Sequence, residues 1–178
     1  RGLFRPPSYL SGTWYYLNIE PGAKPDLLAN AENIPLPNSS VDTFIMSEVL
    51  EHLANPEQCL AEISRILKPG GHGVITIPFL YPMHADPWDF QRWTDVRIKK
   101  ELESVNLDVV ELQLMGGAFA VIADILHVSF SKLPAFWRRV LLLSLRCLKT
   151  VFQSQIERQD PHVTTGFGVI VRKPSVTK

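Results

Sequence analysis

A strand, a helix and a second strand are predicted by one stretch, Ile34–Pro78, which reads IPLPNSSVDTFIMSEVLEHLANPEQCLAEISRILKPGGHGVITIP. The first strand is Val41–Met46 and the second is Gly73–Ile77, and both are rich in β-branched and other apolar residues. Two strands joined by a helix make a βαβ unit, in which the strands are parallel and ligands lie at their carboxyl ends. The stretch therefore predicts an α/β fold with a site at that edge of the sheet.

The helix between these strands has its own start and stop signals. Asn55 suits the N-cap, Pro56 suits the first helical position, and Gln58 suits a capping box. One helical face collects the apolar residues Leu60, Ile63, Ile66 and Leu67. The sequence Lys68–Gly71 (KPGG) predicts the helix end and a tight turn, with a cation in the last helical turn.

The rest of the chain continues the alternation of strands and helices. Further strands are expected at residues 13–20, 27–29, 107–114 and 163–172, and further helices at 95–105, 118–128 and 134–155. Between them, Phe79–Thr94 is a long loop dense in proline, histidine, aspartate and aromatic residues, which is typical of a binding loop. We expect a single domain over residues 1–178, with a helical lid or insertion at about 118–155.

Composition and charge exclude several classes of protein. The chain has 18 Lys plus Arg against 18 Asp plus Glu, so no overall field attracts nucleic acid. Its 46% hydrophobic and 20% charged residues argue against disorder. No apolar run is long enough to span a bilayer. Cys59 and Cys147 lack metal-type spacing, and we expect reduced thiols in a cytoplasmic protein.

Two motifs resemble the class I S-adenosylmethionine-dependent methyltransferases, in their small-molecule, type 11-like branch. NAENIPLPNSSVDTFIMSEVLEHLANP is similar to the adenine loop and fourth strand of that family, and AEISRILKPGGHGVITIP is similar to its next helix and fifth strand. The loop PMHADPWDFQRWT resembles one found in a bacterial subgroup. The resemblance implies a Rossmann-like methyltransferase fold, with a mostly parallel sheet flanked by helices. It also implies S-adenosylmethionine as the cofactor and direct methyl displacement onto a small-molecule substrate.

The sequence departs from the family in one respect. The glycine-rich motif that follows the first strand of the family does not occur, and Arg1–Gly12 holds only isolated glycines. In the family the first strand lies in the middle of the sheet. Its loss would split the sheet and leave strand edges without hydrogen-bond partners in its interior. We expect the natural protein to continue upstream of Arg1, the alternative being an unusually repaired fold. Such exposed edges would invite pairing into a homo-oligomer.

Six residues are expected to contact the cofactor: Glu20, Asn30, Ala31, Glu32, Ser47 and Glu48. Glu20 ends a predicted strand, where an acid can accept both ribose hydroxyls. By resemblance, the loop from Asn30 borders adenine, with the amide in place of the usual acid. Ser47 and Glu48 end the next strand and by resemblance lie near the methionine part. The alternatives are a solvated acid at Glu20 and an ordinary polar turn at Asn30.

The acceptor side is expected to involve His52, His84, Asp89 and Arg92. His52 is the candidate general base or substrate contact, because imidazole titrates near neutral pH. The alternative is a histidine that makes only a structural hydrogen bond. Arg92 can bind a carboxylate or a phosphate of the acceptor. The alternative is an ion pair with Asp89, which would only hold the loop in a self-stapled conformation. We expect no metal site, because no pair of the five scattered histidines has ligand spacing with an acid partner.

Other functions are open at this point. The apolar helix 134–155 has a basic stripe. Such a helix can lie on a membrane surface, cover a hydrophobic acceptor, or act as a lid or a dimer contact. A non-catalytic binding or scaffold domain that has lost the cofactor glycine loop is the main alternative to an enzyme. A nicotinamide-dependent oxidoreductase would need a glycine-rich fingerprint before Glu20.

Overall fold

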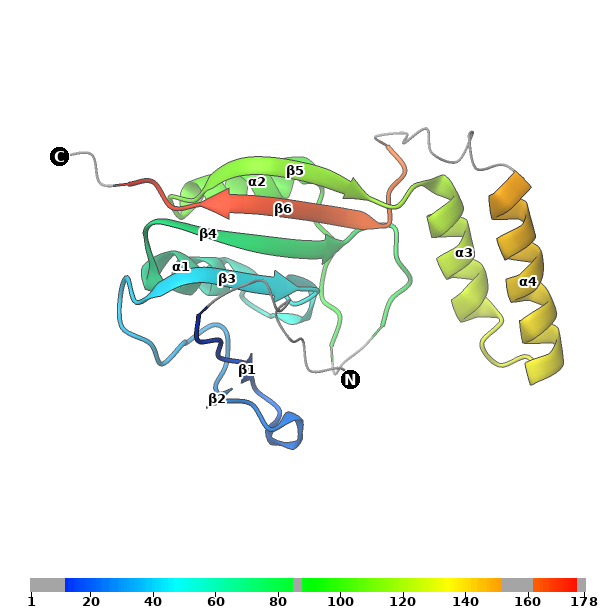
Figure 1. The fold of residues 1–178 in the computed structure, drawn as a ribbon, viewed down its shortest axis with the longest axis horizontal. Helices are drawn as coiled ribbons and strands as arrows, with labels where there is room; N and C mark the ends of the chain where they lie inside the picture. Colours follow the sequence, from blue (N-terminus) through cyan, green and yellow to red (C-terminus); the bar gives the residue numbers. More distant parts are fainter. Residues whose placement is uncertain (1–11, 85–87, 152–161, 176–178) are drawn as a thin grey trace.

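The computed structural model describes residues 12–84, 88–151 and 162–175 (Figure 1). Its central sheet has four strands, in the spatial order β3 (Val41–Ser47), β4 (Leu67–Pro78), β6 (Gly166–Arg172) and β5 (Asp108–Met115). A second, two-stranded sheet consists of β1 (Leu17–Asn18) and β2 (Leu27–Leu28). The split of the sheet that the sequence predicts is therefore present in the described residues.

The strand expected at residues 13–20 is much shorter than predicted. Only Leu17–Asn18 pairs, and its partner among the described residues is the equally short Leu27–Leu28. A strand extends only as far as a neighbour offers hydrogen bonds. The aromatic and apolar pattern was therefore a correct signal for a strand but a poor guide to its length.

The four-stranded sheet is mixed in direction. β3 and β4 are parallel, as the βαβ unit predicts, whereas β6 is antiparallel to both β4 and β5. Figure 1 shows the arrowheads of β3, β4 and β5 at one end of the sheet and that of β6 at the other. The expectation of a mostly parallel sheet is confirmed, because β3, β4 and β5 run in the same direction and only β6, among the described strands of this sheet, is reversed. The helix between β3 and β4 supplies the crossover that parallel neighbours need. The chain between β5 and β6 leaves the sheet instead.

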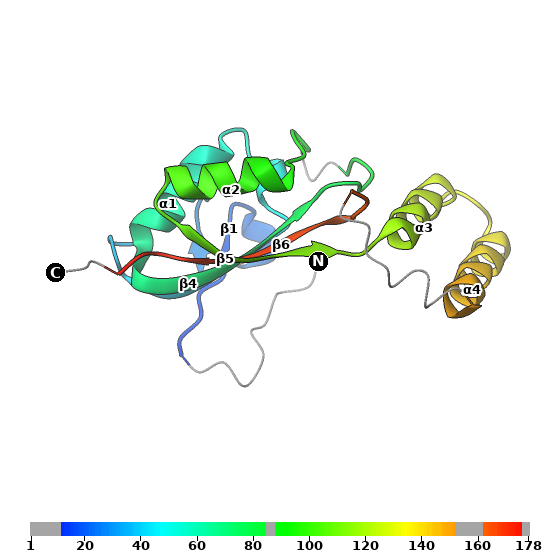
Figure 2. The same cartoon turned by 90° about the horizontal axis from the view of Figure 1, so that it is seen from above.

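Two helices, α1 (Pro56–Ile66) and α2 (Asp95–Ser104), cover one face of the sheet (Figure 2). The core between them and the strands includes the fully buried side chains Leu60, Leu67, Ile75, Ile98, Leu102, Val169 and Val171. On the strands, Val74 and Ile170 alternate with these buried residues and are 37% and 36% exposed. Within the described part of the chain, the sheet is thus covered mainly on one face.

The start of α1 differs from the capping that the sequence predicts. The Asn55 side chain does not cap the helix; its backbone N–H and Nδ2 donate to Glu32 Oε1 (2.9 Å) and Oε2 (3.4 Å). Gln58 Nε2 donates to the Glu32 carbonyl (3.1 Å) and forms no capping box. Asn55 does occupy the N-cap position, as predicted, but neither side-chain cap forms, because Asn55 and Gln58 direct their hydrogen bonds to Glu32 of the preceding loop.

The end of α1 is more abrupt than expected. β4 already begins at Leu67, so Lys68–Gly71 lies within the strand and forms no separate turn. Gly70 has a φ of 79°, in the left-handed region that the glycine pattern predicts. The pairing of β3 with β4 shifts register in this segment. Gly70 and Gly71 therefore lie in an irregular first part of β4, where the register with β3 shifts.

Helices α3 (Ala118–Ser129) and α4 (Ala135–Val151) form a hairpin beyond the end of the sheet at which β5 finishes (Figures 1 and 2). Residues 152–155 of the expected second helix lie outside the described residues. Large apolar side chains stay exposed on this hairpin, including Ile122, Phe136, Trp137 and Leu143. No described helix is both long enough and apolar enough to cross a membrane.

A charged pair on α1 holds the loop that leads into β3. Glu62 Oε2 accepts the Ile34 N–H (2.8 Å), and Arg65 donates to both Glu62 oxygens (2.7 and 2.8 Å). Arg65 also donates to the carbonyls of Leu36 and Ile34 (both 2.8 Å). The hydrogen bond from Arg65, followed by that from the Ile34 backbone, lowers the pKa of Glu62.

This lowered pKa predicts an acid-dependent loss of stability. Because the folded state favours the Glu62 carboxylate, its contribution is present above its unfolded pKa and disappears as pH falls through the folded value. We expect Glu62→Gln to cost about 1 kcal/mol of unfolding free energy at pH 7, since the charged hydrogen bonds are partly solvated. The cost should shrink below about pH 4, where the wild-type carboxyl also protonates. Urea unfolding at pH 7 and pH 3 measures both values, and Glu57→Gln, on the exposed side of α1, is the control.

Candidate functional site

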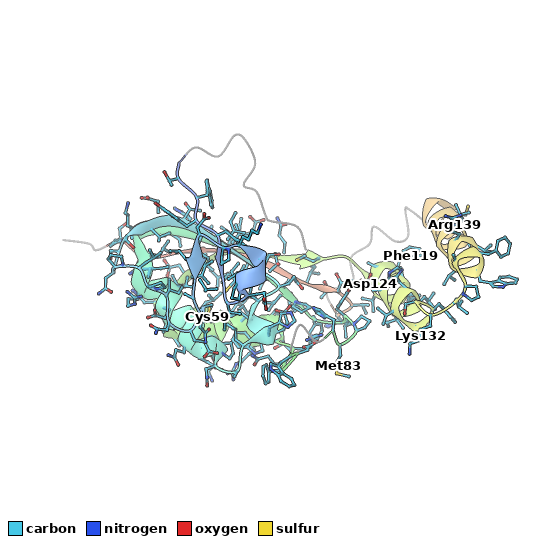
Figure 3. The ribbon with its side chains drawn as sticks, turned by 90° about the horizontal axis from the view of Figure 1, so that it is seen from below. Cys59, Met83, Phe119, Asp124, Lys132 and Arg139 are labelled. Carbon is cyan, nitrogen blue, oxygen red and sulfur yellow. The ribbon has the colours of Figure 1, made fainter. Side chains whose placement is uncertain are left out.

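A hollow of about 250 Å³ lies at the carboxyl ends of β3, β4 and β5. Its lining includes Ser47, Glu48, Thr76, Tyr81, Asp124 and Gly166. Helix α3, which carries Asp124, lies between the sheet and α4 (Figure 3), and burial raises the pKa of the Asp124 carboxyl. The position agrees with the site that the βαβ unit predicts, and α3, from the segment expected as a lid or insertion, lines the hollow through Asp124.

The tip of β3 has a strained backbone. Glu48 has a φ of 52°, which is uncommon for a residue with a side chain, and its N–H donates to the Thr76 carbonyl (3.0 Å). Ser47 and Thr76 share a hydroxyl–hydroxyl bond of 2.9 Å. Glu48 Oε1 is buried and has no hydrogen-bond partner among the described residues. A strained strand tip with an unpaired carboxylate oxygen is a feature of ligand sites.

The residues predicted to hold a nucleoside follow the two-stranded sheet. Glu20 is exposed, and among the described residues its carboxylate accepts only a weak hydrogen bond, from the Gly22 N–H (3.3 Å). Asn30 Oδ1 accepts the Glu32 N–H (2.9 Å), while Ala31 packs against the core. Asn30 and Glu32 thus have structural partners already, and Glu20 retains acceptor capacity. Contact of all four with adenosine stays a prediction.

Two residues of the predicted acceptor side, His52 and His84, come together around one buried carboxylate. Glu51, in the 3₁₀ turn η2 (Leu50–His52), is 2% exposed, and neither of its oxygens hydrogen-bonds to a described residue. Its Oε1 lies 3.5 Å from His52 Nε2 and 3.9 Å from His84 Nε2. The two imidazole rings meet edge to face, 5.1 Å apart. Burial, and then the charge of Glu48, raise the pKa of Glu51.

The loop that carries His84 is fixed by a second charge pair. Asp89 is 6% exposed and accepts both terminal nitrogens of Arg92, with Nη2 at 2.7 Å. Asp89 Oδ2 also accepts the His84 N–H (3.0 Å). The hydrogen bond from Arg92 is the main reason that the pKa of Asp89 falls to about 2. The self-stapled loop that the sequence left as an alternative is thus present, and it positions His84.

Backbone contacts tie this loop to η2. The Phe90 N–H donates to the Glu51 carbonyl (2.8 Å), and Gln91 Nε2 donates to the Leu50 carbonyl (3.1 Å). Met83, in contrast, is 87% exposed and projects from the molecule (Figure 3). Sequence reasoning named His52, His84, Asp89 and Arg92 but did not single out Glu51. Its position directly before His52 was the available signal.

The family model described as "Methyltransferase domain" matches residues 18–75. This range runs from β1 through most of β4, including both strands of the βαβ unit. The ubiquinone/menaquinone biosynthesis C-methyltransferase of Burkholderia vietnamiensis is 35% identical over 128 residues, covering 54% of this chain and 52% of the relative. The chain thus spans about half the length of that curated relative.

Solved structures show the same fold. An S-adenosylmethionine-dependent methyltransferase from Archaeoglobus fulgidus matches with a TM-score of 0.55 and 16% identity, over 88% of this chain and 74% of the other. Phosphoethanolamine N-methyltransferase 2 of Haemonchus contortus, solved with S-adenosyl-L-methionine, matches with a TM-score of 0.51 and 15% identity, over 82% and 36%. The predicted family resemblance, the Rossmann-like fold, and S-adenosylmethionine as the family's cofactor are confirmed.

Proposed function

We propose that this chain, a methyltransferase domain of the type 11 branch by sequence match and fold, binds S-adenosylmethionine and takes part in methyl transfer to a small-molecule acceptor. The observation that carries the proposal is the hollow at the carboxyl ends of β3 and β4. The methyltransferase family model, which matches residues 18–75, includes all of β3 and most of β4. Ligands of open α/β sheets bind at this edge.

The residues at the two ends of the proposed cofactor site fit its chemistry. Glu20 offers an exposed carboxylate that can accept the two hydroxyls of a ribose. At the tip of β3, the buried and unpaired Glu48 Oε1 offers negative charge next to the hollow. A sulfonium is a cation, so a carboxylate at this position favours it over the neutral thioether left after transfer. Asn30, Ala31, Glu32 and Ser47 complete the proposed set.

The proposed acceptor position lies on the side of His52 and His84. S-adenosylmethionine supplies an activated methyl group, so the protein's task is chiefly to align the acceptor with it. Asp89 and Arg92 position His84 through their bonds to its loop. The helical segment at about 118–155 is proposed as a lid, because Asp124 of α3 contributes to the wall of the hollow.

The cofactor proposal predicts a loss of affinity when Glu20 is changed. We expect S-adenosylhomocysteine to bind the full natural protein in isothermal titration calorimetry, and Glu20→Ala to weaken it about 10- to 100-fold, because charge-assisted hydrogen bonds to the ribose disappear. Glu103→Ala, an exposed acid on α2, should leave the affinity unchanged.

Two results would contradict the proposal. Absence of binding heat at millimolar S-adenosylmethionine or S-adenosylhomocysteine in a protein that melts cooperatively would favour the non-catalytic scaffold alternative. Equal affinities for wild type and Glu20→Ala would remove Glu20 from the site while keeping the cofactor.

A further inference from the structure

The Glu51 carboxylate is buried without the partners that such a group requires. Its side chain is 2% exposed, and neither oxygen forms a hydrogen bond within the described structure. The small cavity beside it, about 10 Å³, is lined largely by apolar side chains such as Leu50, Ile77 and Trp93. A buried carboxylate without hydrogen bonds is costly unless a cation compensates it. Within 4 Å of Glu51 Oε1, the titratable groups of the described residues are the two imidazoles, while the Arg92 guanidinium acts on this carboxylate from farther away.

Both imidazoles present the nitrogen that a metal ion would use. His52 Nδ1 lies 2.5 Å from the Trp88 carbonyl, and His84 Nδ1 lies 3.3 Å from the Pro82 carbonyl. A carbonyl only accepts, so each Nδ1 carries the hydrogen. In the neutral ring, Nε2 then has a free lone pair. Metal-binding histidines are commonly oriented in this way, with the second nitrogen on a backbone carbonyl.

The three ligand atoms also have suitable spacing. One atom each from Glu51, His52 and His84 lies within 4.8 Å of the other two. The pairs of Glu51 Oε1 with the His52 and His84 nitrogens measure 3.5 and 3.9 Å. A tetrahedral zinc site with bonds of about 2.0–2.1 Å has ligand separations of about 3.4 Å. Shifts of a few tenths of an ångström would bring the two carboxylate–imidazole pairs to this separation, and rotation of the two imidazoles, whose ligand atoms lie within 4.8 Å of each other, would close the site.

We propose that Glu51, His52 and His84 form a binding site for a divalent transition-metal cation of the Zn²⁺ type. Two imidazoles and one carboxylate form a donor set that suits Zn²⁺, whereas Mg²⁺ and Ca²⁺ prefer sites made of oxygen ligands. His52 and His84 are 18% and 38% exposed, so an ion can enter from solvent. Three protein ligands leave a position for water or for an oxygen of the acceptor.

The site is assembled by two segments that are distant in sequence. Glu51 and His52 belong to η2, and His84 belongs to the loop that the Asp89–Arg92 pair holds. The charge of Glu48 adds to the negative potential around Glu51. The sequence predicts no metal site because its histidines are scattered along the chain, and the fold brings two of them together only in space.

Cobalt titration tests the proposal without cofactor or methyl transfer, so its failure is separate from failure of the proposed function. The full natural protein carrying Cys147→Ser, which removes an exposed thiol, is dialysed against a chelator and titrated with Co²⁺. We expect the visible absorption of four- or five-coordinate Co²⁺ to saturate at one equivalent and to be displaced by one equivalent of Zn²⁺. Zn²⁺ should also raise the thermal midpoint.

Matched variants locate the ion. Glu51→Gln and His84→Ala should each weaken Co²⁺ binding at least about 10-fold. His72→Ala and His127→Ala, at exposed positions on β4 and α3, should not change it. Circular dichroism melts establish that each variant is folded, and Glu51→Gln keeps the size of the side chain in case His84→Ala does not fold. Equal Co²⁺ affinity in wild type and Glu51→Gln, or no absorption band in a folded wild type, would overturn the site.

Discussion

Replacing Gly166 with alanine is expected to cost about 3 kcal/mol of unfolding free energy or more, a large share of the stability of an ordinary domain. Gly166 is the first residue of β6 and pairs with Pro78 on one side and Met115 on the other. A Cβ at this position would lie 2.3 Å from the Ile77 carbonyl oxygen and 3.2 Å from the Pro78 Cα. These are backbone atoms of β4, the neighbouring inner strand, so the clash is relieved only if β4 and β6 separate.

Gly168 provides the matched control two residues along the same strand. A Cβ there meets only the Met115 side chain, at 3.7 Å or more, which is an ordinary contact. Gly168→Ala should therefore change stability by less than about 1 kcal/mol, and a small gain would follow from the stiffer unfolded chain. Urea unfolding followed by circular dichroism compares the two variants. Equal effects would show that the close approach of β4 to β6 does not limit residue size at Gly166.

The success of sequence reasoning on this fold depended on local pattern. The βαβ unit, α2 and β6 were predicted because their periodicity and end signals lie within the element itself. The N-cap position of Asn55 was predicted correctly, but its side-chain cap was not formed, because Asn55 bonds to Glu32, 23 residues earlier in the chain. The strand at residues 13–20 was predicted too long because strand length depends on a partner, here only Leu27–Leu28. Predictions of capping and of strand length therefore fail where the hydrogen-bond partner is a residue distant in the sequence.

The same distinction applies to the site. The location of the site at the ends of β3 and β4 follows from the topology of the sheet alone. For this reason Ser47 and Glu48 were predicted to face the crevice, and both line the hollow. The meeting of His52 and His84 depends on how the long loop returns to η2, and no spacing rule predicts that return. Glu51 was missed because burial, which makes its carboxylate unusual, cannot be read from a polar residue in a helical pattern.

Breaking the Asp89–Arg92 pair from one side is expected to cost about 3 kcal/mol, because it leaves a largely buried charge without its partner. The side chains of Asp89 and Arg92 are only 6% and 20% exposed. Asp89→Asn keeps the size of the side chain but removes the countercharge of the guanidinium, and Arg92→Gln leaves a buried carboxylate. Urea unfolding at pH 7 gives both costs. Asp95→Asn, which weakens an exposed pair with Lys99 on α2, should cost less than about 1 kcal/mol.

The double variant separates the charge pair from its positioning role. With Asp89→Asn and Arg92→Gln together, neither member of the pair is left as an unpaired charge, so the total cost should fall short of the sum of the single costs by about 1–3 kcal/mol. Affinity for Co²⁺ should behave differently. Asp89 also accepts the His84 N–H, and a neutral amide holds it more weakly, so binding should stay reduced in the double variant. Recovery of stability together with full Co²⁺ affinity would show that the pair stabilises the loop without positioning His84.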